Sequence, residues 1–312
     1  MTTTWPDPPP LFAVSDLDHP GEKPSWLPRP ASGARRRPTR RDDALVEALF
    51  DADGRIPADS PDTADQEITM AFEQLAAQFA PQPGRLFSRV AVFDLETTGV
   101  DVRSDRIVTA FVGVLDETGA VLEAESWIAD PGIEIPAGAA AVHGFTTERA
   151  RAEGRDAREV VGEIVASLGR LLDAGIPVVA YNAPFDFSVL ANEARRHGFA
   201  PLADPSPVVD PLVIDKQQDT YRRGKRTLDI VAAHYGVSLD DAHEASADAI
   251  AAGRIALAQA ERYAADLPGT PAELHAQQVG WARAQADSLG AYFVKIGKLQ
   301  PGETLEGGWP IR

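Results

Sequence analysis

The sequence predicts an α/β protein with a mixed five-stranded sheet and flanking helices. Two observations lead to this prediction. Three strand-like runs follow one another, and only a short turn separates the second from the third, which is typical of an antiparallel meander. Beyond them, short apolar runs alternate with segments of helical periodicity, which is typical of a sheet that includes parallel strands. The 312 residues are enough for one sizeable core with extensions.

The meander is expected in the first part of this core. Its first strand contains the apolar run Val90–Phe93, and the next two strands cover Arg106–Asp116 and Val121–Ala129. Gly119 lies between the second and third strands and suits a tight hairpin turn. Residues 130–144 are rich in Gly and Pro, so we expect a long loop there, and loops of this length in compact domains often carry function.

Helices and short strands alternate in the remainder of the chain. Apolar residues recur at helical spacing in each expected helix, and Pro or Gly often marks its ends. Because exposed apolar faces need cover, we expect the tail helix to pack on the core. The expected helices cover 156–173, 184–197, 211–219, 227–235, 244–267 and 271–289, and the two further strands cover 177–182 and 207–210.

The amino-terminal part has a different composition. Residues 1–41 are rich in Pro, with arginines gathered at 35–41, and they are expected to be disordered or extended. The arginines could contact nucleic acid, although a solvated tail is the simpler interpretation. Helices are expected near 42–51 and 64–80, where they could pack on the core or on a partner. We therefore divide the chain into an extension (1–85), a core domain (86–267) and a helical tail (268–312).

Composition restricts the chemistry. The chain has no cysteine, which excludes disulfides and thiolate metal sites, so a metal would need oxygen or imidazole ligands. The net charge of −17 argues against binding nucleic acid by bulk electrostatics, but an enzyme could still engage a few phosphates through metals and local basic residues. Without a recognisable signal peptide or a bilayer-length apolar run, we expect a cytoplasmic protein with no membrane partner.

The first strand ends in two acids, Asp94 and Glu96. Residues two apart on a strand share a face, so both carboxylates point the same way while Leu95 points into the core. Neighbouring carboxylates repel each other, and a hard divalent cation such as Mg²⁺ or Mn²⁺ offsets this repulsion. A polar strand end without a metal would explain the same pattern, unless further carboxylates reach this place.

Further acids could meet the first two. Asp186 follows the strand at 177–182, and Asp248 opens a late, alanine-rich helix that could approach the sheet closely. Asp186 could also be only a favourable acid in the first turn of a helix. His243 precedes Asp248 by five residues, and a histidine can accept a proton from water near neutral pH. Taken alone, His243 is better explained as a surface loop residue.

Three segments resemble, as a set, the motifs of the DEDDh 3′–5′ exonucleases. This is the DnaQ-like group, which includes the proofreading epsilon subunit of bacterial DNA polymerase III. Residues 142–146 also look like a recurring loop of that group, and the resemblance covers roughly residues 86–262. The three segments are Asp94-Leu-Glu96-Thr-Thr-Gly, Asn182-Ala-Pro-Phe-Asp186 and His243-x-x-x-x-Asp248. Tyr181 departs from the pattern, because many members have a histidine there.

The resemblance implies a ribonuclease H-like fold and a two-metal phosphodiesterase site. The implied cofactors are two divalent ions, Mg²⁺ or Mn²⁺, and the implied partner is the 3′ end of a single-stranded nucleic acid. Thr97, Asn182 and Phe185 would bind the terminal nucleotide, and His243 would deprotonate the attacking water. The implied metal ligands are Asp94, Glu96, Asp186 and Asp248.

Three functions compete. The first is a DNA exonuclease that releases nucleoside 5′-monophosphates, and the second is a 3′–5′ exoribonuclease acting on RNA ends or short oligonucleotides. The motifs do not separate these two, because the choice depends on how the pocket treats a 2′-hydroxyl. The third is a nucleic-acid- or polymerase-associated binding module. A protein partner could bind through the flanking helices in any of these cases.

Several other polar residues have two interpretations each. His143 could contact substrate or serve the structure of its loop. Asp210 and Asp215 could be accessory acids, but ordinary turn and helix roles are favoured because Asp is common at such positions. The basic residues of 222–226 could guide a nucleic-acid strand through its phosphates or form a solvated loop.

Overall fold

The computed structural model describes residues 85–239 and 245–312. All of them belong to the second of two units into which the chain divides, Pro81–Arg312. The helices expected near 42–51 and 64–80 lie outside the described residues, and so does His243. No helix of the described part is long and apolar enough to cross a lipid bilayer.

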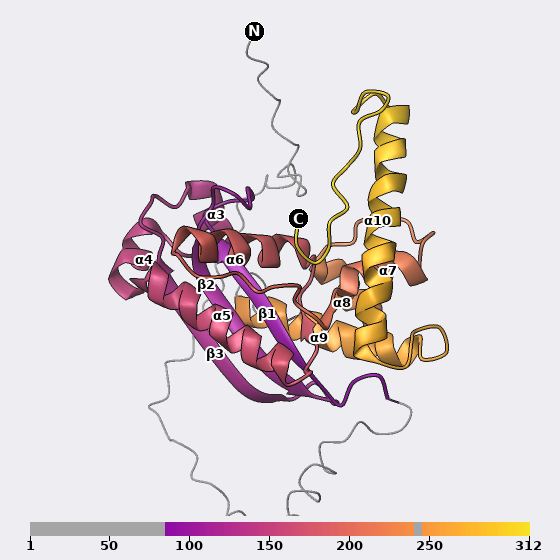
Figure 1. Ribbon diagram of the computed structural model, residues 1–312, viewed down its shortest axis with the longest axis horizontal. Helices are drawn as coiled ribbons and strands as arrows, with labels where there is room; N and C mark the ends of the chain where they lie inside the picture. Colours follow the sequence, from indigo (N-terminus) through magenta and orange to yellow (C-terminus); the bar gives the residue numbers. More distant parts are fainter. Residues whose placement is uncertain (1–84, 240–244) are drawn as a thin grey trace, which may run out of the picture. The chain divides into compact units, whose positions relative to one another are not determined.

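The predicted antiparallel meander is present (Figure 1). It consists of β1 (Arg89–Thr97), β2 (Ile107–Asp116) and β3 (Val121–Asp130). In the register, Val92 of β1 faces Gly113 of β2. The expected mixed sheet is therefore built outward from β1, the strand that carries the first two acids.

Parallel strands extend the sheet on both sides. The two-residue strands β5 (Val178–Val179) and β6 (Val208–Val209) lie beyond β1. A third short strand, β4 (Arg155–Asp156), pairs with the end of β3, so the described sheet has six strands in the order β4-β3-β2-β1-β5-β6. The prediction of five strands missed β4, because an exposed Arg-Asp pair has neither strand propensity nor an apolar pattern.

The prediction of a long loop at 130–144 is partly wrong. It contains α3 (Ala137–His143), and α4 (Thr147–Glu153) follows directly. Gly144 adopts a left-handed conformation with φ 77°, and the Thr146 side chain accepts a hydrogen bond from the backbone N–H of Arg149. Gly144 and Thr146 thus end one helix and begin the next. The Gly and Pro residues of this segment indicate a loop in the sequence, although the same residue types also occur at helix ends.

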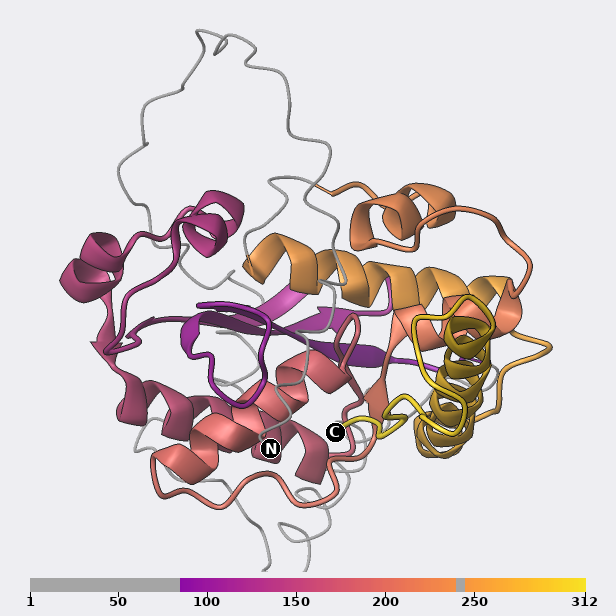
Figure 2. The ribbon, with the colours of Figure 1, turned by 90° about the horizontal axis from the view of Figure 1, so that it is seen from above.

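Helices cover both faces of the sheet. Figure 2 shows α9 on one face and α5 with α6 on the other. Phe93 of β1 packs edge-on against Phe187 of α6, with ring centroids 5.5 Å apart. The described helices of this second half are α5 (Ala157–Asp173), α6 (Pro184–Arg196), α7 (Pro211–Gln218), α8 (Leu228–Tyr235), α9 (Ala245–Arg262) and α10 (Pro271–Lys295).

The slim helix α9 approaches the sheet closely, as predicted from its small residues. A Cβ atom added to Gly253 would lie 2.4 Å from a methyl carbon of Val92 and 2.7 Å from one of Leu115. Glycine is therefore required here by the short distance between helix and sheet. The helix ends at Arg262, whereas the sequence predicts that it continues to residue 267.

The tail packs on the core as expected, and α10 is longer than the 271–289 predicted. It lies beside the edge strand β6, and side chains of α10 accept hydrogen bonds from backbone N–H groups in and directly after this strand. His275 Nδ1 accepts a hydrogen bond from the Val208 N–H at 3.0 Å, and Gln278 Oε1 accepts one from the Asp210 N–H at 2.8 Å. Because α10 satisfies the polar edge of β6, it takes the place of a further strand.

Candidate active site

Asp94 and Glu96 lie on the face of the sheet that α9 covers. The side chains of β1 alternate between two apolar clusters: Val92 packs in the cluster beneath α9, while Phe93 and Leu95 pack in the opposite one. Leu95 is buried, as predicted. The alternation of the strand therefore places both acids toward α9.

The helix α9 adds a third acid to this pair. Asp248 lies in its first turn, where the alanines on either side allow the helix to approach β1. Carboxylate oxygens of Asp94, Glu96 and Asp248 all lie within 4.8 Å of one another. The structure thus brings together three of the four acids named from the sequence, although more than 150 residues of chain separate Asp94 from Asp248.

Asp186 comes from the other side of the sheet. It lies in the first turn of α6, is 3% exposed, and its Oδ1 accepts a hydrogen bond from the Leu95 N–H at 3.2 Å. That backbone group lies between Asp94 and Glu96 in the sequence. Asp186 is therefore joined to the backbone of β1 at the acidic cluster.

Burial and mutual repulsion make these carboxyl groups weak acids. Burial, followed by the charges of Asp248 and Asp186, raises the pKa of Glu96 from 4.5 to about 8. Burial also raises the pKa of Asp186 to about 8, and the pKa of Asp94 is raised by burial and then by its three acidic neighbours. Within the described part of the chain, no lysine or arginine forms an ion pair with Asp94 or Glu96. The site has the chemistry of a cation-binding centre.

The three predicted nucleotide-binding residues lie at the same end of the sheet. Thr97 ends β1, and its hydroxyl donates a hydrogen bond to the Gly99 carbonyl at 2.6 Å. Asn182 lies between β5 and α6 in a left-handed conformation with φ 61°, and its carbonyl accepts a hydrogen bond from the Phe185 N–H at 2.9 Å. Residues other than glycine rarely adopt this backbone conformation, and those that do are often found at functional sites.

Asp210 proves to be a structural anchor of this site. It is 1% exposed, and its two oxygens accept hydrogen bonds from the N–H groups of Asn182 and Ala183, each at 3.0 Å. It also caps α7 by accepting from the Leu212 N–H at 2.9 Å. The favoured helix role is confirmed, but sequence reasoning missed the link to Asn182. In the sequence, an Asp immediately before Pro211 indicates a helix cap, but no sequence pattern indicates the contact between Asp210 and Asn182.

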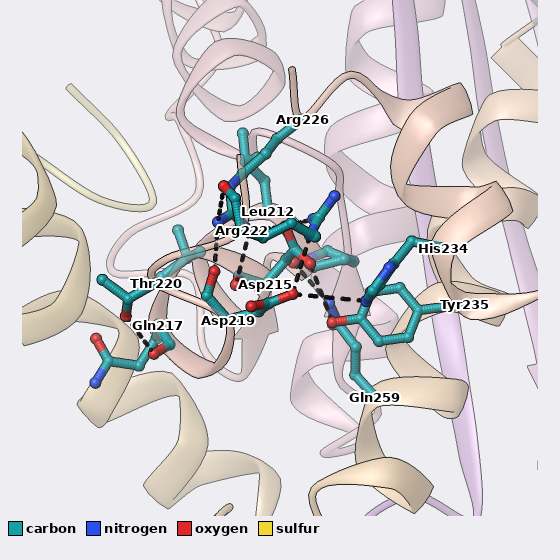
Figure 3. A network of polar contacts seen from close by, with 12 residues as sticks. Leu212, Asp215, Gln217, Asp219, Thr220, Arg222, Arg226, His234, Tyr235 and Gln259 are labelled. Atoms are coloured by element: carbon teal, nitrogen blue, oxygen red, sulfur yellow. Dashed lines mark hydrogen bonds and ion pairs between the residues drawn. The ribbon is translucent and has the colours of Figure 1, made fainter. Parts of the chain in front are cut away.

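Asp215 is fully buried in a network of arginines (Figure 3). The guanidinium groups of Arg222 and Arg226 both pair with its Oδ2, and the Tyr235 hydroxyl donates to its Oδ1 at 3.0 Å. The carboxylate of Asp215 thus forms ion pairs with two cations, which supports the structural interpretation over an accessory acid. Arg222 and Arg226 are turned inward onto Asp215, so neither the phosphate-contacting nor the solvated-loop interpretation of 222–226 describes these two residues.

His143 ends α3 and is buried. Its Nδ1 accepts a hydrogen bond from the Phe145 N–H at 3.2 Å, and burial lowers the pKa of the imidazole. The imidazole thus stabilises the turn between α3 and α4, in keeping with a structural loop role.

A ribonuclease H-like sheet with acids clustered at the end of its central strand defines a class of nucleases. A family model described as Exonuclease matches residues 91–256, more than half of the chain. The chain belongs to this exonuclease family, the DnaQ-like 3′–5′ exonucleases, a class of phosphodiester hydrolases.

Similar proteins include parts of bacterial DNA polymerases. A PolC-type DNA polymerase III from Lacticaseibacillus paracasei is 28% identical over 225 residues, which are 72% of this chain and 15% of that protein. A DNA polymerase III subunit epsilon-like protein from Rhodobacter capsulatus is 29% identical over 167 residues, 51% of this chain and 22% of that one. The chain thus spans less than a quarter of the length of these relatives.

Solved structures share the fold. A structure of exonuclease I superposes with a TM-score of 0.50 and 22% identity, covering 56% of this chain and 41% of that one. E. coli exonuclease I in complex with a dA16 oligonucleotide matches equally well, at 23% identity. The predicted ribonuclease H-like fold is confirmed.

Proposed function

We propose that this chain is a metal-dependent 3′–5′ exonuclease that releases nucleoside 5′-monophosphates from DNA. The observation that carries the proposal is the meeting of Asp94, Glu96 and Asp248 within 4.8 Å at the end of β1, in a chain of the exonuclease family. The domain responsible is residues 86–267, and 268–312 form a helical extension of it.

The acidic residues fit divalent cations. Their donor atoms are all carboxylate oxygens, which suit Mg²⁺ or Mn²⁺, and the raised pKa of Glu96 reflects its burial and then the repulsion of Asp248 and Asp186, which a bound cation would offset. Asp94, Glu96, Asp186 and Asp248 are the residues that would hold two ions. When bound, such ions stabilise the negative charge that develops on the attacking and leaving oxygens of a phosphodiester.

The other residues of the site bind substrate and move a proton. His243 accepts the proton of the attacking water; it lies outside the described residues, and its proposed role rests on the motif. Thr97, Asn182 and Phe185 orient the terminal nucleotide. The fixed conformation of Asn182, held by Asp210, supports this role because a rigid turn positions a ligand with little loss of entropy.

We favour DNA over RNA as the substrate because the similar proteins from L. paracasei and R. capsulatus are both named as DNA polymerase III proteins. An exoribonuclease is the second candidate. A binding module without catalysis is the third, and the clustered acids argue against it. We further propose that the substrate is a single-stranded 3′ end, and that a protein partner could bind through the flanking helices.

The test is degradation of 5′-labelled single strands of DNA and RNA of equal sequence, with Mg²⁺, Mn²⁺ or EDTA. We expect stepwise shortening of DNA from its 3′ end, lost in EDTA and in Asp94→Ala. The matched control is Asp173→Ala, which removes an exposed acid at the end of α5 and should retain full activity. Preference for RNA would favour the exoribonuclease, and no cleavage of either strand would favour a binding module.

A further inference from the structure

The loop between α7 and α8 carries basic side chains of two kinds. Arg222 and Arg226 are turned inward onto Asp215, as Figure 3 shows. Arg223 and Lys225 are exposed, and so is Tyr221, whose side chain is 95% exposed. The loop therefore uses two cations as anchors and presents an aromatic ring and two cations to solvent.

The anchors hold the loop in place. The Arg226 carbonyl accepts a hydrogen bond from the Tyr181 hydroxyl at 2.6 Å, and its guanidinium donates to the Asp215 carbonyl at 3.1 Å. Gly224 has a φ of +104°, which lets the backbone turn between Arg223 and Lys225. The exposed groups thus belong to a loop fixed at both anchors.

The hydrogen bond from the Tyr181 hydroxyl to the Arg226 carbonyl places the loop near the acidic site. β5 runs parallel to β1 with Val179 beside Val92, so Tyr181 continues β5 at the level of Asp94. Tyr181 also packs in the apolar cluster beneath α9, on the face to which Asp94 points. The anchor of the loop therefore lies at the end of the sheet where the acids gather.

The chemistry of the exposed groups suits a single-stranded nucleic acid. Within the described residues, neither Arg223 nor Lys225 forms an ion pair, although the whole chain carries a net charge of −17. An exposed aromatic ring flanked by cations can stack on a base while the cations contact phosphates.

We propose that Tyr221, Arg223 and Lys225 form a docking surface for the single-stranded DNA that leads into the acidic site. Tyr221 stacks on a base, and Arg223 and Lys225 contact the backbone phosphates of nucleotides upstream of the 3′ end. This inference rests on the proposed function and adds to it the part of the protein that binds the strand away from the reacting phosphate.

The first measurement is the Kd of a fluorescent 20-nucleotide oligothymidylate, made on the full chain with Asp94→Asn to prevent cleavage. We expect Tyr221→Ala to weaken binding roughly ten-fold and Tyr221→Phe to restore it, because stacking needs the ring and not the hydroxyl. Arg223→Ala and Lys225→Ala should each reduce the slope of log Kd against log salt by about 0.7, the value for one phosphate contact on a single strand.

The controls are Tyr292→Ala and Lys295→Ala. Both residues are exposed near the carboxyl end of α10, and Figure 1 shows that this end of the helix projects away from the sheet. We expect neither change to alter oligonucleotide binding. Equal Kd values for the Tyr221→Ala protein and its parent would overturn the proposed surface, and so would an equal loss of binding in the controls.

A second measurement separates this surface from the acidic site. With Asp94 intact, Tyr221→Ala should hydrolyse the p-nitrophenyl ester of thymidine 5′-monophosphate within two-fold of the unaltered protein, because the proposed surface binds only nucleotides upstream of the 3′ end and this ester has none. A matching loss of ester hydrolysis would overturn the proposal. If the unaltered protein hydrolyses neither ester nor DNA, the proposed function fails, while the Kd comparison still decides whether the loop binds DNA.

Discussion

The indole N–H of Trp309 points at the carboxylate of Asp210, with 3.4 Å between Nε1 and Oδ2. Trp309 lies in the tail, beyond the residues that the family model matches, and both side chains are buried. The same Asp210 holds the backbone of Asn182 and Ala183, which precede α6 and its Asp186. The tail is thus linked to the turn that presents one of the four candidate metal ligands.

Asp210→Asn tests this link. Each oxygen of Asp210 accepts at least two hydrogen bonds, so an amide NH₂ would face donors in either orientation. We expect a loss of about 2 kcal/mol in the free energy of unfolding, measured with urea. Asp173→Asn, at an exposed position, should change it by less than about 0.5 kcal/mol. An unchanged stability in Asp210→Asn would remove Asp210 as an anchor.

The metal-free protein should lose stability as the pH rises. The pKa of Glu96 is about 8 in the folded protein and ordinarily 4.5, so folding favours the protonated form. The resulting stabilisation is fully present below pH 4.5 and is lost as the pH rises through 8. Unfolding measured in EDTA between pH 5 and 8 should show this decline, and Glu96→Gln should reduce it. A decline that is identical in the variant would contradict the assignment.

Divalent ions should reverse that loss. If Mg²⁺ binds only the folded protein, a concentration one hundred times its Kd adds about 2.7 kcal/mol to the free energy of unfolding. Thermal unfolding at pH 8 with Mg²⁺, Mn²⁺ or EDTA measures the gain. Asp94→Asn should abolish it, whereas Asp173→Asn should keep it. A gain that survives in Asp94→Asn would place the ions elsewhere.

His243→Ala should remove the limb of the pH–rate profile near neutrality, because imidazole is the side chain that most readily exchanges protons with water in that range. The profile of DNA cleavage, measured from pH 5.5 to 9 for both proteins, is the readout. His234→Ala is the control, since His234 lies on α8 near Asp219, and its profile should match the unaltered protein. A near-neutral limb that persists in His243→Ala would exclude this residue as the base.

Gly253→Ala should destabilise the protein, because the added methyl group would overlap Val92 and Leu115. We expect a loss of about 1–3 kcal/mol, measured with urea. Gly280→Ala is the matched control within another helix: nothing lies within 4 Å of its added Cβ atom. Alanine there should raise stability by about 0.5–1 kcal/mol through its higher helix propensity. Equal effects at the two positions would argue against close packing of α9.

Patterns within short segments were predictable from the sequence. The alternation of β1 predicted a buried Leu95 with Asp94 and Glu96 on the other face, and this arrangement is observed. The helices α5 to α8 begin and end within two residues of their predicted bounds. The pair Gly144 and Thr146 was misinterpreted because the same residue types mark loops and helix ends, and only the conformation of the backbone separates the two.

The sequence by itself determined the fold class, the family and the acids that could form a site, because periodicity and motif spacing are properties of neighbouring residues. Only the tertiary structure decided which side chains meet and which remain exposed. It brought Asp248 to Asp94, joined Trp309 to Asp210, and turned Arg222 inward while leaving Arg223 exposed. Such pairings depend on how helices pack against the sheet, and the free energy of that packing is shared among many distant residues.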